Sequence, residues 1–89
     1  MIDTPGRAAL SAHCDAIGGQ SEAARQITAA GAPITQSAVS QWVRGATRPE
    51  PLMREVLARV LSIPVDAWTT ADERATIDRV DAIAADRAS

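Results

Sequence analysis

The chain has 89 residues, which suffices for one compact domain with a modest hydrophobic core. Hydrophobic residues make up 46% of it, but Phe and Tyr are absent and Trp42 and Trp68 are its only aromatic residues. Sheets favour aromatic and β-branched side chains, so this alanine-rich composition predicts an all-α fold. Nine arginines and eleven acidic residues give a net charge of −2, which argues mildly against nucleic acid as a partner of the whole chain.

The charge is unevenly distributed along the sequence. Between Gln20 and Arg54 four arginines face two acidic residues, a local positive surplus. From Ala71 to Ser89 three arginines face five acidic residues, so the negative excess lies in the C-terminal stretch.

Nothing in the sequence indicates export or membrane insertion. No apolar run is long enough to span a membrane, and the first residues lack the pattern of a signal peptide. The single cysteine, Cys14, cannot form an internal disulfide bond. We therefore expect a cytoplasmic protein with no membrane partner.

The first two helices are predicted from the residues at their ends. Thr4 followed by Pro5 is typical of an N-cap and the first helical position, and the glycines at 18–19 end this helix. A second helix opens at Gln20. The Gly-Ala-Pro sequence at 31–33 stops it, because proline cannot continue a helix.

Similar signals predict the next two helices. Thr35 is a suitable N-cap for a helix over residues 36–44, and Gly45 terminates that helix. A fourth helix opens at Pro51 and breaks at the Ser-Ile-Pro sequence of 62–64.

The C-terminal part is predicted to begin with a short helical turn over 65–68. Thr70 and Glu73 then have the spacing of a capping box, which starts a last helix. We thus expect five to six helices, with residues 1–70 as one domain and residues 71–89 as an additional C-terminal helix. The apolar spacing predicts a core that contains Leu10, Ile17, Ala24, Ile27, Val39, Trp42, Val56, Leu57 and Val60.

The helix predicted over residues 36–44 separates its apolar and polar side chains completely. At about 100° per residue the two sets occupy different sides of the helix, and no acidic residue lies on the polar side. The apolar set is Ala38, Val39, Trp42 and Val43, and the polar set is Gln36, Ser37, Ser40, Gln41 and Arg44.

This polar face suits the major groove of DNA. Gln engages adenine through its two-pronged amide, Arg engages guanine, and Ser bonds to several base edges. The simpler interpretation is an amphipathic helix whose polar face is only solvated.

The sequence around this helix resembles a known family. The run GGQSEAARQI…ITQSAVSQWVRG…RPEP is similar to the helix-turn-helix of the phage Cro/repressor (XRE-type) family, and the similarity extends through LARVLSIPVDAW. It covers roughly Leu10 to Trp68. The resemblance implies a lambda-repressor-like bundle and a sequence-specific, double-stranded DNA-binding transcriptional regulator of phage or prophage type.

The resemblance also implies roles for individual residues. The side chains that would read base edges are Gln36, Ser37, Ser40 and Gln41. Gln20 would bond a phosphate of the DNA backbone, and Thr35 and Arg44 would contact the backbone or flanking bases. Thr47 and Arg48, in the loop after this helix, are further candidates for the DNA backbone because they lie beside the reading helix, and solvation is an equally good explanation of Arg48. Gln20 would also brace Gln36.

The sequence departs from the family in the turn between the second and third helices. Family members usually have a shorter connection between the positions that match Ile27 and Ile34, whereas six residues intervene here. Either the second helix runs an extra turn or the loop bulges.

The sequence is also compatible with a function that does not involve DNA. A helical protein-interaction module, antirepressor or antitoxin-like, would keep the fold without binding DNA, and the net negative charge favours it. We do not expect an enzyme, a small-molecule substrate or a cofactor, because no candidate nucleophile–base set is visible. His13 and Cys14 are too few ligands for a closed zinc site, so no metal is expected.

We expect a homodimer on a palindromic operator. One small module reads few base pairs, and related regulators act as two-fold dimers whose reading helices lie about 34 Å apart. The last helix carries an apolar stripe of Ile77, Val80, Ile83 and Ala84. This stripe either folds back on Leu57, Leu61 and Trp68 of its own chain or packs on the same helix of a second chain.

Overall fold

The computed structural model describes residues 1–88 as six helical segments and no strand, which confirms the predicted all-α class. The segments are α1 (Pro5–Ile17), α2 (Gln20–Ala29), α3 (Gln36–Arg44), α4 (Pro51–Val60), the 3₁₀ helix η1 (Val65–Trp68) and α5 (Ala71–Ala88). Ser89, the last residue of the predicted C-terminal segment, lies outside the described residues. None of the described helices is both long and apolar enough to cross a membrane.

The helices begin and end at the local signals that the sequence contains. Thr4 Oγ1 accepts a hydrogen bond of 3.2 Å from the N–H three residues further on, and Gly18 closes α1 in the left-handed region with a φ of 102°. Thr35 caps α3 in the same way at 3.2 Å, and Gly45 ends it with a φ of 74°. These positions need glycine because other residues adopt such a positive φ at an energetic cost.

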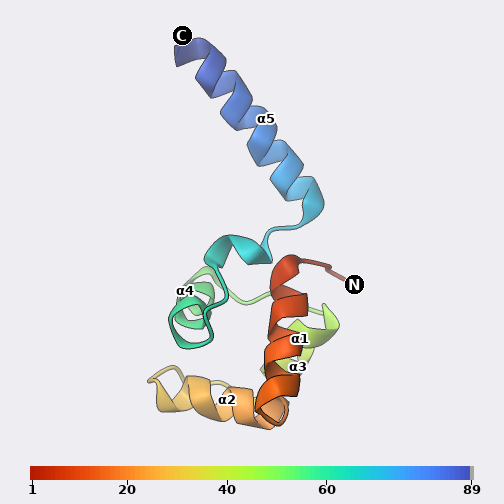
Figure 1. Ribbon diagram of the computed structural model, residues 1–89, viewed down its shortest axis with the longest axis vertical. Coiled ribbons are helices and arrows are strands. Elements are labelled where there is room, and N and C mark those ends of the chain that lie inside the picture. Colours follow the sequence, from red (N-terminus) through yellow and green to blue (C-terminus); the bar gives the residue numbers. More distant parts are fainter. Residues whose placement is uncertain (89) are drawn as a thin grey trace.

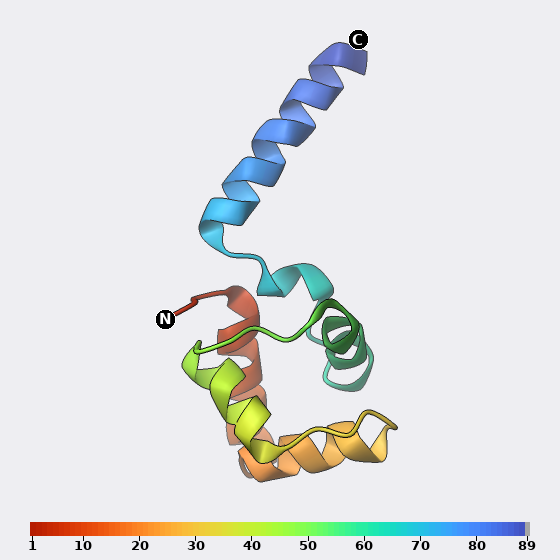
Figure 2. The ribbon, with the colours of Figure 1, turned by 180° about the vertical axis from the view of Figure 1, so that it is seen from behind.

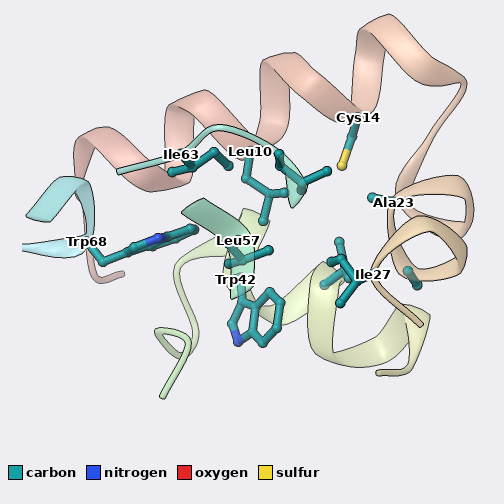
Figure 3. Close-up of a cluster of buried hydrophobic side chains, with 11 residues drawn as sticks. Leu10, Cys14, Ala23, Ile27, Trp42, Leu57, Ile63 and Trp68 are labelled. Carbon is teal, nitrogen blue, oxygen red and sulfur yellow. The ribbon is translucent and has the colours of Figure 1, made fainter. Parts of the chain in front are cut away.

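The core lies where α1 to α4 and η1 converge (Figure 3). Its buried apolar side chains are Leu10, Cys14, Ala23, Ala24, Ile27, Val39, Trp42, Leu57, Leu61, Ile63 and Trp68. The prediction was wrong for Ile17, Val56 and Val60, which are only partly buried at the edge of this cluster. Leu61, the C-cap residue of α4, and Ile63 beyond it are buried instead.

The indole of Trp68 closes the bundle against the start of α1. It is 1% exposed, and a Cβ added at Gly6 would come within 2.6 to 2.8 Å of three of its ring carbons. Arg48 also donates a hydrogen bond of 3.2 Å to the Trp68 carbonyl oxygen. Residues 62 positions apart in sequence thus pack directly on each other, and the contact ties η1 to α1.

The helix α5 starts at the predicted capping box. The Thr70 N–H donates to Glu73 Oε1 at 2.9 Å, and the Glu73 N–H donates to Thr70 Oγ1 at 3.2 Å. The Glu73 carboxylate also pairs with Arg48 Nη1 at 2.5 Å. The first turn of α5 is therefore joined to the loop that follows α3.

Beyond its first turn, α5 points away from the helical body formed by α1 to α4 and η1 (Figure 1). The view from behind shows the same separation (Figure 2). No pair of described helices that pack together includes α5, and Ile77, Val80 and Ile83 are exposed. The interpretation in which this stripe folds back on Leu57, Leu61 and Trp68 is therefore wrong.

The contact between Arg48 and Glu73 predicts an unusual titration. We expect the pKa of Glu73 to be about 2 instead of its ordinary 4.5, because hydrogen bonds from Arg48 and from the Thr70 N–H favour the charged carboxylate. A lowered pKa in the folded state stabilises the fold above about pH 4.5, and this contribution is lost as the pH falls towards 2.

An NMR titration of the side-chain carboxyl carbons measures this pKa directly. In the Arg48→Gln variant the pKa of Glu73 should move back towards 4.5. A value near 4.5 in the unaltered protein would show that the contact does not form in solution.

Candidate nucleic-acid interface

The polar side chains of α3 lie on the outer side of the helical body. Gln36, Ser37 and Arg44 are exposed, whereas Ser40 and Gln41 are half-buried. The opposite side of α3 packs on α1 and α2, and Figure 2 shows α3 crossing α1 at the surface. Val39 and Trp42 are buried, as predicted for the apolar face. The expectation that Ser40 and Gln41 are exposed together with Gln36 and Arg44 is met only in part, because both side chains are half-buried, as are Ala38 and Val43.

The C-terminal end of α3 is held by the first residues of the chain. The Ile2 N–H donates to the Gly45 carbonyl oxygen at 2.7 Å, and Arg7 Nη1 donates to the Val43 carbonyl oxygen at 3.2 Å. A Cβ at Gly45 would meet the Ile2 carbonyl oxygen at 2.6 Å, so the close approach requires glycine. This role of Arg7 is not predictable from the sequence, because no local signal marks a contact between residues 36 positions apart.

The long connection between α2 and α3 is a bulged loop that folds back on α2. The helix ends at Ala29, two residues beyond Ile27, so it does not run a full extra turn. Thr28 Oγ1 accepts a hydrogen bond from the Ile34 N–H at 3.1 Å and donates one to the Ile34 carbonyl oxygen at 3.2 Å. Ile34 is thereby held beside α2, where it packs on the core and is partly buried.

A shallow groove lies beside the N-terminal end of α3. Its lining residues are Ser21, Ala24, Arg25, Thr28, Ala29, Ile34 and Gln36. Arg25 pairs with Glu22, which lowers the pKa of Glu22 and raises that of Arg25. Gln20 and Gln36 share no hydrogen bond within residues 1–88, so the structure does not show the predicted bracing of Gln36 by Gln20.

The loop after α3 positions one of the predicted base-reading amides. Thr47 Oγ1 donates to Gln41 Oε1 at 3.5 Å, and the Thr47 N–H approaches the Gln41 carbonyl oxygen at the same distance. The carbonyl end of the Gln41 amide therefore faces the loop, and its NH₂ group remains available as a donor.

The arginines between Gln20 and Arg54 are largely engaged within the chain. Arg25 pairs with a glutamate on its own helix, Arg48 with Glu73, and Arg54 Nε donates to a backbone carbonyl at 2.8 Å. Arg44 is exposed, and within residues 1–88 its side chain donates one hydrogen bond, of 3.4 Å, to the Ser40 carbonyl oxygen. The local positive surplus of the sequence therefore reaches the outer face of α3 chiefly through Arg44.

A larger depression lies between the start of α1 and the connection from η1 to α5. Its lining residues are Asp3, Thr4, Pro5, Ala8, Asp66, Ala67, Thr69, Thr70, Ala71 and Arg74. Both of its carboxylates are in ion pairs, Asp3 with Arg7 at 3.0 Å and Asp66 with Arg74 at 3.7 Å. Among residues 1–88, no group of three or more His, Cys, Asp or Glu side chains is arranged to hold a metal ion.

The fold and this site define a small all-helical protein that presents one acid-free polar helix face at its surface. Comparisons with protein-family models, with curated proteins and with solved structures find no match to the chain.

Proposed function

We propose that this protein is a sequence-specific regulator of transcription that binds double-stranded DNA and reads the major groove with α3. The observation that carries the proposal is the outer face of α3, where amides, hydroxyls and one guanidinium are presented without an acidic residue. The resemblance of residues 10–68 to the phage Cro/repressor (XRE-type) helix-turn-helix, with its lambda-repressor-like bundle, supports it independently of the geometry.

The N-terminal turn of α3 is the part that we expect to contact base edges. Recognition helices of this motif use their first residues for base contacts, and here those residues are the exposed Gln36 and Ser37. Gln36 has no hydrogen bond to another described side chain, so its amide is available for the N6 and N7 atoms of adenine. Ser40 and Gln41 follow on the same face, with the Gln41 NH₂ group as a further donor.

Phosphate contacts would come from backbone N–H groups and from a few side chains beside α3. Gly19 gives the N-terminus of α2 no side-chain cap, so the first N–H groups of α2, next to Gln20, suit a phosphate oxygen. Thr35 and Thr47 flank α3, and Arg44 supplies the available positive charge. Arg48 would have to leave Glu73 to contribute.

This limited number of cations sets the expected salt dependence. Each neutralised phosphate contributes a slope of about −0.9 to the plot of log K against log salt concentration. With one exposed Arg44 on the reading face, we expect a shallow slope of roughly −1 to −2 per bound chain.

The test is duplex binding by fluorescence anisotropy across a salt series, first with a random pool and then with sequences selected from that pool. We expect salt-dependent binding and enrichment of one motif. Arg44→Ala should flatten the slope by about one, whereas Arg59→Ala, on α4 and paired with Glu55, should leave it unchanged. Absence of both salt-dependent binding and enrichment would overturn the proposal.

The second candidate is a helical protein-interaction module of the antirepressor or antitoxin kind. The net charge of −2 and the exposed α5 favour it. The same experiment separates the two, because this module predicts no binding to duplex DNA at any salt concentration.

A further inference from the structure

The helix α5 carries an apolar face that nothing in the described chain covers. Ile77, Val80 and Ile83 are 40%, 58% and 57% exposed, and α5 packs on none of the described helices. Burial of apolar side chains is favourable because it removes apolar surface from water. A face that combines several of them therefore favours binding to a partner. The charged residues of α5 indicate which partner fits.

We propose that a second copy of this chain covers the face, with the two α5 helices antiparallel about a two-fold axis. The central line of the face follows alternating steps of three and four residues, as in a coiled coil, and Ile83 lies on its flank. The residues of this central line are Glu73, Ile77, Val80, Ala84 and Arg87. In a parallel pair each of these positions meets itself, so Glu73 would face Glu73 and Arg87 would face Arg87. Like charges would then oppose each other at both ends of the interface.

The antiparallel register that sets Ile77 against Val80 of the second copy removes both clashes. The two-fold axis repeats this apolar layer, and Glu73 then faces the small Ala84 of the second copy. Glu73 keeps its partner Arg48 in its own chain, so no carboxylate is left unpaired in the contact. The two helix dipoles also oppose each other in this arrangement, which is electrostatically favourable.

The flanks of the face fit the same register. A two-fold axis perpendicular to the helix pair brings each flank onto the same flank of the second copy. On one flank Arg74, which also lies 3.7 Å from Asp66 of its own chain, meets Asp81 of the second copy. On the other flank Thr76 meets Ile83, and the symmetry makes each contact twice. The surface is thus complementary to itself in charge and in apolar area, as an isologous interface requires.

The contact is small, so the dimer should be weak and should depend on concentration. Sedimentation of the full-length protein without DNA, over a concentration series, should show the apparent mass doubling. Val80→Asp should abolish the doubling, whereas Ala82→Asp, on the opposite face of α5, should leave it intact. A protein that stays monomeric throughout, or equal effects of the two variants, would overturn the proposal.

A charge exchange tests the predicted flank. Arg74→Asp alone and Asp81→Arg alone should each weaken dimerisation, and the double variant should restore it. The two positions lie about 10 Å apart along one helix, so they cannot pair within a chain, and rescue must come from the second copy. Failure of the double variant to regain any dimerisation would overturn the register.

A spin label at Arg87→Cys tests the orientation. Antiparallel helices place the two labelled backbones about 25 Å apart at 1.5 Å rise per residue. Parallel helices place them about 10 Å apart, near the interaxial distance. Cys14 is buried and burial raises the pKa of its thiol, so the exposed position is labelled selectively. A short distance would refute the antiparallel dimer. None of these measurements involves DNA, so their outcome is independent of the proposed function.

Discussion

Replacing Trp68 with alanine should lower the free energy of unfolding by about 3–5 kcal/mol, as expected for a large aromatic side chain removed from a core. The indole is 1% exposed and lies between the start of α1 and the residues that follow α4 (Figure 3). Its loss removes the contact that joins η1 to α1 and leaves a cavity that the short helices cannot refill. Urea denaturation followed by circular dichroism measures the change.

Gly6→Ala tests the same contact from the other side. Alanine in place of a helical glycine normally stabilises by up to about 1 kcal/mol. Here the added Cβ would come within 2.6 to 2.8 Å of the indole ring, and such overpacking costs about 1–3 kcal/mol. We therefore expect net destabilisation by Gly6→Ala, and a smaller penalty when Trp68→Ala is also present. A stabilising Gly6→Ala would show that the indole lies elsewhere.

Replacing Gln36 with alanine should weaken binding to the selected duplex by about 1–3 kcal/mol and relax the preference at one base pair. This follows from the proposed function: Gln36 is exposed in the first turn of α3, and alanine keeps the helix but removes the amide. Dissociation constants for a set of duplexes, each altered at a single base pair, locate the affected position.

The matched control is Arg44→Ala on the same face. It should weaken all sequences to a similar extent, because a guanidinium that contacts phosphate carries no sequence information. If Gln36→Ala left the preference at every base pair unchanged, α3 would not be the reading helix. Circular dichroism should show that both variants keep the helical content of the unaltered protein.

Most helix boundaries of this protein can be predicted from local signals in its sequence. Thr4 and Thr35 as caps, Gly18 and Gly45 as terminators and the capping box after Thr70 all act within one helical turn. Such signals can be recognised from the sequence alone, because a capping side chain and the backbone group that it hydrogen-bonds lie only a few residues apart. The polar face of α3 was predictable for the same reason, since helical periodicity fixes which residues share a side.

The way in which the helices pack together depends on contacts that form only in the folded chain. Three contacts join residues that are distant in sequence. The indole of Trp68 packs on Gly6, Arg7 donates to the last turn of α3, and Arg48 pairs with Glu73. The last of these contacts engages an arginine that the sequence assigned to the DNA backbone. The sequence also left open whether the stripe of α5 packs on its own chain, and the structure shows it exposed. Periodicity shows that a face is apolar, but it carries no information about which surface covers it, because burial depends on how the whole chain is arranged in space.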